Sequence, residues 1–279
     1  MQSDHLSNSK SPLNPPEGRR RVAVLIPCFN ESGRVGVVVQ SVRRVMPDAV
    51  VVVVNDGSAD DTSAEALAAG AIVLNHASNM GYGAALETGY MYAFGNGFDY
   101  VLQMDGDGQH IAEELRSLLA PLEEDRSDMV IGSRYGHPGN AFRPAFMRRA
   151  GHRLFALLLF AATGRFFRDP TSGFQGLNRR ALELLAGGVL PYDYPDSDVL
   201  LMALMSGLRV VEIPVRMRPR TGGESMHSGL VEPIYYGLKM SLSMFIVLLN
   251  FRLWRKWKAV HGSPATPGKE GMRCTNASS

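Results

Sequence analysis

The sequence predicts an α/β protein with a doubly wound, mostly parallel sheet that is flanked by helices. From Arg21 to His110, short apolar runs alternate with stretches of helical spacing, which is the pattern of repeated βαβ units. The run Val50–Val54 consists of valine alone, as expected for a parallel strand that is covered on both faces. Polar residues follow directly after the strands, at the edge where open α/β sheets bind their ligands. The sequence therefore predicts a ligand site along that edge.

The expected elements of the first half follow one another in the order βαβαβαβ. We expect strands over Arg21–Pro27, Val50–Val54, Ala71–Leu74 and Tyr100–Met104, and helices over Glu31–Val45 and Gly83–Phe94. In the second half we expect strands over Asp128–Gly132 and Leu208–Met217, an apolar helical stretch over Leu154–Ala162, and a helix that follows Tyr194 and runs to Met205.

Composition limits the class of protein. With 279 residues, of which 45% are hydrophobic, the chain can form one large domain or two small ones. A formal net charge of +2 provides no broad basic face for nucleic acid. Cys28 and Cys274 have no spacing for a disulfide framework or a zinc site, so a reducing, cytosolic setting fits best.

The two ends of the chain differ from the middle. Residues 1–20 are rich in polar residues and lack the apolar core of a signal peptide, so we expect a disordered leader and a cytoplasmic domain. We expect the folded domain over residues 21–230, an amphipathic helix within 231–260, and a disordered tail over 261–279.

An acidic loop follows the apolar run that begins at Tyr100. Asp105 and Asp107 are each followed by a glycine, and Gln109 and His110 come next. Two carboxylates at a strand end suit a hard cation such as Mg²⁺ or Mn²⁺, which is often held by one or two carboxylates together with substrate phosphates. The alternative is a polar turn that caps the next helix. An EF-hand is excluded, because His110 and Arg116 stand where Gly and Glu are required.

Polar residues also follow the first two strands. Glu31 comes after the first strand and Asp56 after the second, and either carboxylate can accept hydrogen bonds from a base or a ribose. A plain turn is the alternative for Asp56, and for Asp60–Thr62 we retain a helix cap. The stretch Asn79–Leu86 is a weak dinucleotide fingerprint but a reasonable loop for opening a helix near a ligand.

The second half contains candidate anion-binding residues. Arg134 ends the strand that begins near Asp128, where its planar fork can bind phosphate oxygens; the alternative is a surface salt bridge. Arg149 precedes the apolar stretch from Leu154, and a cation beside an apolar helix suits an anionic lipid headgroup. Pro170 and Gly173 predict a turn.

Together these segments resemble the ordered motifs of family-2 glycosyltransferases of the GT-A fold, and in particular the dolichyl- and polyprenyl-phosphate sugar synthases such as dolichol-phosphate mannosyltransferases. The resemblance covers Arg21 to Gly229. Its motifs are Ile26–Glu31, Val54–Ser58, Asn79–Ala84, Asp105–His110, Gly132–Tyr135, Asp169–Gly176 and Arg218–His227.

The resemblance implies roles for individual residues. Asp56 would bind the nucleobase and Glu31 the ribose, while Asp105, Asp107 and Gln109 would hold Mg²⁺ or Mn²⁺ on the donor diphosphate. The catalytic residues would be Asp107, Arg134 and Arg220. The remaining substrate-binding residues would be Pro27, Phe29, Asn30, Gly83, Arg149, Ser172, Asp198 and Ser225, of which Ser225 lies with Arg220 in a Gly-rich loop that closes over the diphosphate.

The implied reaction is inverting, metal-dependent transfer of a sugar from a nucleoside-diphosphate sugar, GDP-mannose or a UDP-sugar, to polyprenyl phosphate at the cytoplasmic membrane face. One alternative is a hydroxyl acceptor on a glycan or protein, for which Asp196 or Asp198 could be the base. A second is a non-catalytic nucleotide-sugar-binding protein.

The segment after Pro233 predicts contact with a membrane. Leu242, Phe245, Ile246 and Leu249 recur at helical spacing, and all charged residues from Pro233 to Val260 are basic. The uninterrupted apolar run is far shorter than the roughly 20 residues of a membrane span. We therefore expect a helix that lies on the inner face of the cell membrane or against a small membrane protein; a buried core helix and a true span are the alternatives.

Overall fold

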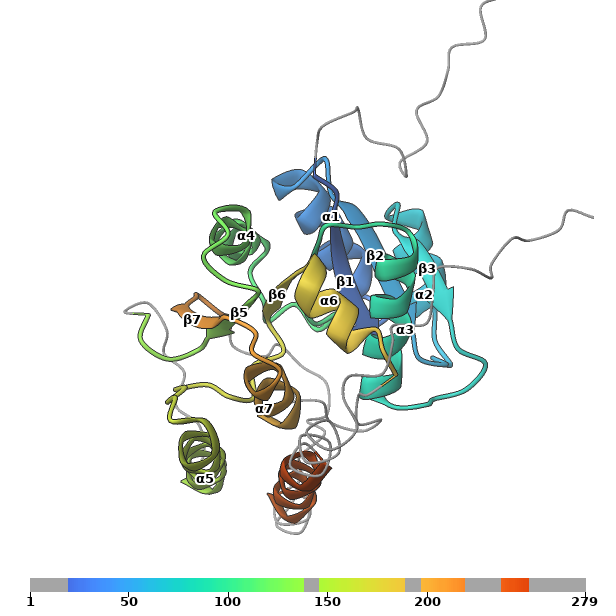
Figure 1. Ribbon diagram of the computed structural model, residues 1–279. Helices are drawn as coiled ribbons and strands as arrows, with labels where there is room; N and C mark the ends of the chain where they lie inside the picture. The colour runs from blue at the N-terminus through green and yellow to red at the C-terminus, as the bar shows by residue number, and fades with distance from the viewer. Residues whose placement is uncertain (1–19, 138–145, 189–196, 219–236, 251–279) are drawn as a thin grey trace, which may run out of the picture.

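The computed structural model describes residues 20–137, 146–188, 197–218 and 237–250. Its centre is a seven-stranded sheet in the order β3-β2-β1-β4-β6-β5-β7 (Figure 1). The strands are β1 (Val22–Cys28), β2 (Val50–Asn55), β3 (Ile72–Asn75), β4 (Tyr100–Gln103), β5 (Met129–Ser133), β6 (Gln175–Asn178) and β7 (Val210–Pro214). β6 runs antiparallel to both of its neighbours, β4 and β5, and the other pairs are parallel. The predicted mostly parallel sheet is confirmed.

Helices cover both faces of this sheet. They are α1 (Val35–Val45), α2 (Thr62–Ala68), α3 (Tyr82–Gly95), the 3-10 helix η1 (Ala112–Glu114), α4 (Leu115–Glu123), α5 (Phe146–Thr163), α6 (Arg179–Leu185) and α7 (Ser197–Met205). Residues 237–250 are also helical.

The alternation of side chains along β1 explains why two layers are needed. Ala23 and Leu25 belong to a core that α3, α5, α6 and α7 complete, whereas Val24 and Ile26 belong to a second core that α1 and α4 complete. Because successive side chains of a strand point to opposite faces, an apolar strand such as β1 must be covered on both. This arrangement leaves the strand ends as the place for polar residues.

The structure shifts or adds a few elements. The first helix begins at Val35, because the amides of Arg34 and Val35 both bond to the carbonyl of Glu31 and form a turn there. β7 ends at Pro214, and Met217 forms an isolated bridge with His110. Strand β6 and helix α6 were not expected. The leader and the tail lie outside the described residues.

Asp128 joins the amino ends of β5 and β7 to the carboxyl end of β6. Its carboxylate accepts hydrogen bonds from the Arg209 amide at 2.8 Å, from the Arg209 guanidinium Nη2 at 3.0 Å, and from Asn178 Nδ2 at 2.9 Å. Burial alone would raise the pKa of this carboxyl, but the hydrogen bonds from Arg209 and Asn178 outweigh it and lower the pKa from 3.8 to about 2. The ionised form is therefore the one that stabilises the fold.

The lowered pKa of Asp128 predicts acid sensitivity. Since it lies below the unfolded value, the contribution is present above about pH 4 and is lost as the pH falls to about 2. A shift of this size corresponds to about 2 kcal/mol. Asp128→Asn is expected to lose that stability at neutral pH and to show a weaker pH dependence between pH 4 and 2 in thermal unfolding. Asp125→Asn, at an exposed partner of Arg209, is the control and should change little.

The helix over residues 237–250 packs on the domain by one face. Met240 and Met244 are buried in the core, and Ser243 donates a hydrogen bond to Asp198 of α7. Figure 1 shows this helix and α5 flanking α7. Leu242, Phe245, Ile246 and Leu249 are exposed, so the predicted apolar face exists and points away from the core. No helix among the described residues has the length and apolar character of a membrane span.

Candidate active site

The loops after β1 and β2 are tied together by Asn30. Its amide donates to Ser58 Oγ at 2.9 Å, and its side-chain carbonyl accepts from the Ala59 amide at 3.0 Å. Asn30 itself has a φ of 55°, a conformation that asparagine tolerates better than most residues. The Glu31 amide donates to Thr62 Oγ1 at 2.8 Å, which adds a second link. These bonds hold two of the predicted donor-binding segments in one place.

The acidic loop leaves the carboxyl end of β4 beside them. A Cβ atom on Gly106 would lie 2.6 Å from Cys28 Sγ and 3.5 Å from Glu31 Cγ, so only a glycine allows this loop to approach β1. Asp107 accepts bonds from the Gln109 amide at 3.0 Å and from Gln109 Nε2 at 2.7 Å. Asp105 and Asp107 are both partly exposed. The structure thus brings together the three residues predicted to hold the metal.

Negative charge accumulates around Cys28. Burial raises the pKa of its thiol above the ordinary range, and the neighbouring carboxylates of Glu31, Asp105, Asp107 and Asp60 raise it further. A bound divalent cation would offset the repulsion among these carboxylates. The donor set also fits Mg²⁺ or Mn²⁺, because it offers carboxylate and amide oxygens from one loop. The described residues contain no cluster of three or more His, Cys, Asp or Glu side chains able to hold a metal.

Asp56 is buried, and both of its carboxylate oxygens have protein partners. Oδ1 lies 2.7 Å from His76 Nδ1 and accepts from the Met80 amide at 2.8 Å, while Oδ2 accepts from the Gly81 amide at 2.9 Å. In this structure Asp56 therefore holds the loop that leads into α3. The contact of Asp56 with a nucleobase stays a prediction. So does the contact of Glu31 with a ribose; here Glu31 forms an ion pair with Arg34 at 2.6 Å.

Arg134 pairs with Asp169, which is fully buried. The guanidinium donates from Nε at 2.8 Å and from Nη2 at 2.5 Å, and Nη2 also reaches Thr171 Oγ1 at 3.1 Å. The alternative of a salt bridge is thus observed, with a buried partner instead of a surface one. Ser172 is buried as well and donates to the Gly132 carbonyl at 2.6 Å. The phosphate-binding role of Arg134 and the substrate contact of Ser172 stay predictions.

The remaining predicted residues differ in their surroundings: some are exposed, some are buried, and some lie outside the described residues. Phe29 is exposed beside the β1 loop, whereas Pro27 lies within β1 and Gly83 is buried in the first turn of α3. Asp198 is buried and bonded to Ser243. Arg149 lies on α5, but its side chain is outside the described residues, as are all of Asp196, Arg220 and Ser225.

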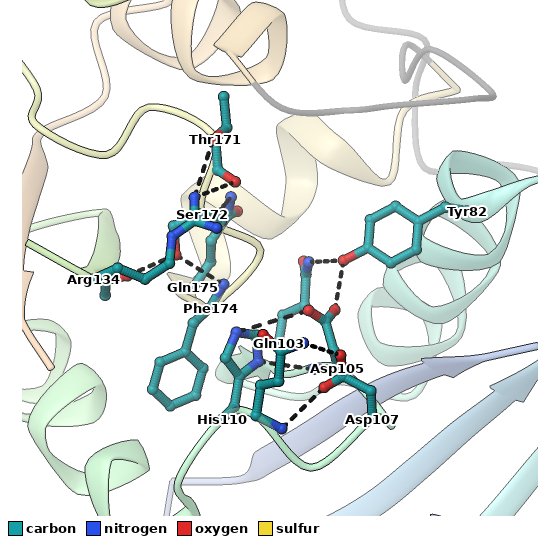
Figure 2. A network of polar contacts seen from close by, with 12 residues as sticks. Tyr82, Gln103, Asp105, Asp107, His110, Arg134, Thr171, Ser172, Phe174 and Gln175 are labelled. Carbon is teal, nitrogen blue, oxygen red and sulfur yellow. Dashed lines mark hydrogen bonds and ion pairs between the residues drawn. The ribbon is translucent and has the colours of Figure 1, made fainter. Parts of the chain in front are cut away.

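Sequence reasoning missed several side chains that hold the site together. Tyr82 donates to Asp105, Gln103 bonds to Tyr82, and His76 supports Asp56 (Figure 2 shows the first two). Gln103 had a visible signal, because it is a polar residue at the end of an otherwise apolar strand. Tyr82 lay within the Asn79–Ala84 motif, but nothing there pointed to its bond with Asp105, and His76 had no signal; each finds its partner across the fold.

An Asp-x-Asp loop at the carboxyl edge of such a sheet, beside the loops after β1 and β2, is the arrangement of GT-A enzymes that use nucleotide-sugar donors. The chain is a glycosyltransferase. Residues 23–185, more than half of the chain, match the model of glycosyl transferase family 2, and the chain belongs to this family. The resemblance drawn from the motifs is confirmed, and the alternative of a non-catalytic binding protein is dropped.

Similar proteins include enzymes of lipid-linked sugar synthesis. The chain is 31% identical over 223 residues to a polyprenol monophosphomannose synthase of Mycolicibacterium smegmatis, with 75% of this chain and 82% of the relative covered. It is 30% identical over 217 residues to an undecaprenyl-phosphate mannosyltransferase of Micrococcus luteus, with 75% and 88% covered.

A solved structure supports the fold. Glucosyl-3-phosphoglycerate synthase of Mycobacterium tuberculosis, crystallised with Mn²⁺, UDP-glucose and phosphoglyceric acid, superposes with a TM-score of 0.61 at 21% identity, covering 82% of this chain and 80% of that one. At this identity the likeness shows the GT-A fold alone.

Proposed function

We propose that this enzyme transfers a sugar, with inversion and with Mg²⁺ or Mn²⁺, from a nucleoside-diphosphate sugar to a polyprenyl phosphate at the cytoplasmic face of the membrane. The observation that carries the proposal is the loop of Asp105, Asp107 and Gln109, held against the β1 loop in a family whose similar members are named for polyprenyl-phosphate acceptors. The M. tuberculosis structure contains Mn²⁺ with UDP-glucose, which supports a divalent metal here.

Asp105 and Asp107 would hold the metal on the donor diphosphate, with Gln109 as the third ligand. The metal, when bound, supplies positive charge that stabilises the departing nucleoside diphosphate. Gln109 already donates to Asp107 through Nε2, and this bond fixes the side chain so that its carbonyl oxygen is the atom left to act as a ligand. The bonds of Asn30 to the loop after β2 would hold the two loops at the nucleoside end of the donor site in fixed positions relative to each other.

A phosphate acceptor would need no general base, because a phosphate monoester is already an anion at neutral pH. A hydroxyl acceptor would need a base. The two candidate bases are Asp196 and Asp198. Asp198 is 1% exposed and accepts hydrogen bonds from Ser243 and from the Val199 amide. This environment does not support a role as the base for a hydroxyl acceptor. Asp196 lies outside the described residues.

The acceptor lipid requires access to a membrane, and two helices offer an apolar surface for it. α5 exposes Leu154, Leu157 and Phe160, and the helix over 237–250 exposes the four side chains that the sequence predicted. Both helices flank α7 (Figure 1). We call these exposed side chains of the two helices the apolar surface. Its proposed partner is the membrane surface; a small membrane protein is the other partner expected from the sequence.

The test is incubation of the enzyme with radiolabelled UDP- and GDP-sugars and a membrane lipid extract, with and without EDTA. We expect label to enter the organic phase with one donor and to stay in water when EDTA is present. Label that leaves the donor but remains in the aqueous phase would mean hydrolysis or a soluble acceptor, and it would overturn the lipid-phosphate assignment.

A further inference from the structure

We propose that Tyr82 is a positioning residue for the metal: its hydroxyl donates to Asp105 and orients this carboxylate for the cation. The inference rests on the proposed metal-dependent function. Tyr82 is the first residue of α3, and its hydroxyl lies 2.9 Å from Asp105 Oδ1 (Figure 2). Ligating carboxylates commonly need such a partner, because an unrestrained side chain loses freedom when it binds a metal.

The direction of the bond is set by a chain of hydrogen bonds that begins in the core. Tyr90 is fully buried, and burial raises the pKa of its hydroxyl above the ordinary range, so it stays protonated. It donates to Gln103 Oε1. The amide nitrogen of Gln103 must then face the other way, and it donates to Tyr82 Oη at 3.1 Å. Since Tyr82 accepts this bond, its proton is directed to Asp105.

The surroundings of Asp105 hold it from the other side. The Asp105 amide donates to His110 Nδ1 at 2.9 Å, so this histidine carries its proton on Nε2, which lies 3.7 Å from Asp105 Oδ2. The ring of His110 stacks on Phe174 with centroids 4.6 Å apart. Tyr82 thus fixes Oδ1, while His110 fixes the backbone at the same residue.

Gly173 supplies the space in which Tyr82 and Asp105 meet. A Cβ atom at this position would lie 2.9 Å from Tyr82 Oη and 3.5 Å from Asp105 Oδ1. The Asp169–Gly176 segment is therefore coupled to the metal loop through the tyrosine. It follows that a methyl group at residue 173 should disturb the metal site mainly by displacing the Tyr82 hydroxyl, because it would make only an ordinary van der Waals contact with Asp105.

The test measures Mn²⁺ binding directly. Free Mn²⁺ is followed by electron paramagnetic resonance during titration of the protein, with saturating UDP in one series and GDP in another. Tyr82→Phe is expected to weaken Mn²⁺ binding about tenfold, the low end of the effect of losing such a partner. Gly173→Ala should weaken it in the same direction. Saturating Mn²⁺ should restore most of the turnover of Tyr82→Phe, which a purely structural defect would not allow.

Two controls separate this role from a loss of folding. Tyr92→Phe makes the same change on the same helix at a partly buried tyrosine away from Asp105, and it should bind Mn²⁺ as the wild type does. In thermal unfolding without metal, the midpoint temperature of Tyr82→Phe should be close to that of Tyr92→Phe. Binding by Tyr82→Phe within twofold of the wild type, when Asp107→Ala abolishes binding, would overturn the positioning role alone. No Mn²⁺ binding by the wild type with either nucleotide would overturn the metal site and the inference together.

Discussion

Asp107→Ala is expected to abolish sugar transfer, by on the order of a thousandfold or more, while the protein remains folded. Asp107 is a partly exposed side chain of a loop at the sheet edge, and it accepts hydrogen bonds from Gln109 of the same loop, so its removal costs the core little. Loss of a metal ligand removes several kcal/mol of transition-state stabilisation, and each 1.36 kcal/mol is a factor of ten in rate.

The measurement is transfer of radiolabelled sugar at saturating donor, with thermal unfolding as the check on folding. Glu113→Ala is the matched control, because it removes an exposed carboxylate a few residues further along the same segment and should leave the rate unchanged. EDTA should abolish wild-type turnover and Mn²⁺ or Mg²⁺ should restore it, whereas added metal should not rescue Asp107→Ala. Full turnover of the wild type in EDTA would show that the loop does not act through a metal.

The parallel half of the sheet could be predicted from the sequence, because a strand that is buried on both faces has an uninterrupted run of apolar residues. Val50–Val54 has no polar residue to place on a solvent side, and the observed β2 pairs with β1 and β3 on either edge. The antiparallel strand β6 left no such trace. Its four residues include Gln175 and Asn178, and it becomes a strand because it fills the gap between β4 and β5.

The sequence singled out the carboxylates of the candidate site, whose roles stay predictions, but not the side chains that support them. Three carboxylates could be singled out, those of Asp56, Asp105 and Asp107. A carboxylate at a strand end costs free energy of desolvation unless it has a function or a partner. The sequence could not show which of these carboxylates are hydrogen-bonded by other residues of the protein. His76 reaches Asp56 across 20 residues of chain, and Asp169 reaches Arg134 across 35, so both contacts depend on the finished fold.

Replacing two exposed side chains of the apolar surface is expected to uncouple the enzyme from its lipid acceptor. Phe245 and Leu249 are 60% and 46% exposed on the outer face of the helix over 237–250. Burying such a side chain in an apolar medium contributes roughly 1.5 kcal/mol or more, so losing both should weaken membrane partitioning on the order of a hundredfold. Glutamate at these positions would also be repelled by anionic headgroups.

A double variant, Phe245→Glu with Leu249→Glu, tests this better than removal of the helix. Met240 and Met244 are buried in the core, so a truncation before Pro233 is expected to destabilise the domain. The control is Val37→Glu with Leu67→Glu, which places the same charges at exposed apolar residues of α1 and α2.

Flotation with vesicles that contain anionic phospholipid measures the outcome. The wild type and the control variant should float with the vesicles and should be released by alkaline carbonate, as a helix lying on the surface is held by partial burial and charge. The double variant should remain in the soluble fraction, transfer little sugar to polyprenyl phosphate in vesicles, and still bind UDP or GDP with wild-type affinity, because the substitutions lie outside the donor loops. Flotation of the double variant at wild-type levels would show that the membrane meets the enzyme at another surface, and retention of the wild type in carbonate would mean that the chain is anchored more deeply than this helix face allows.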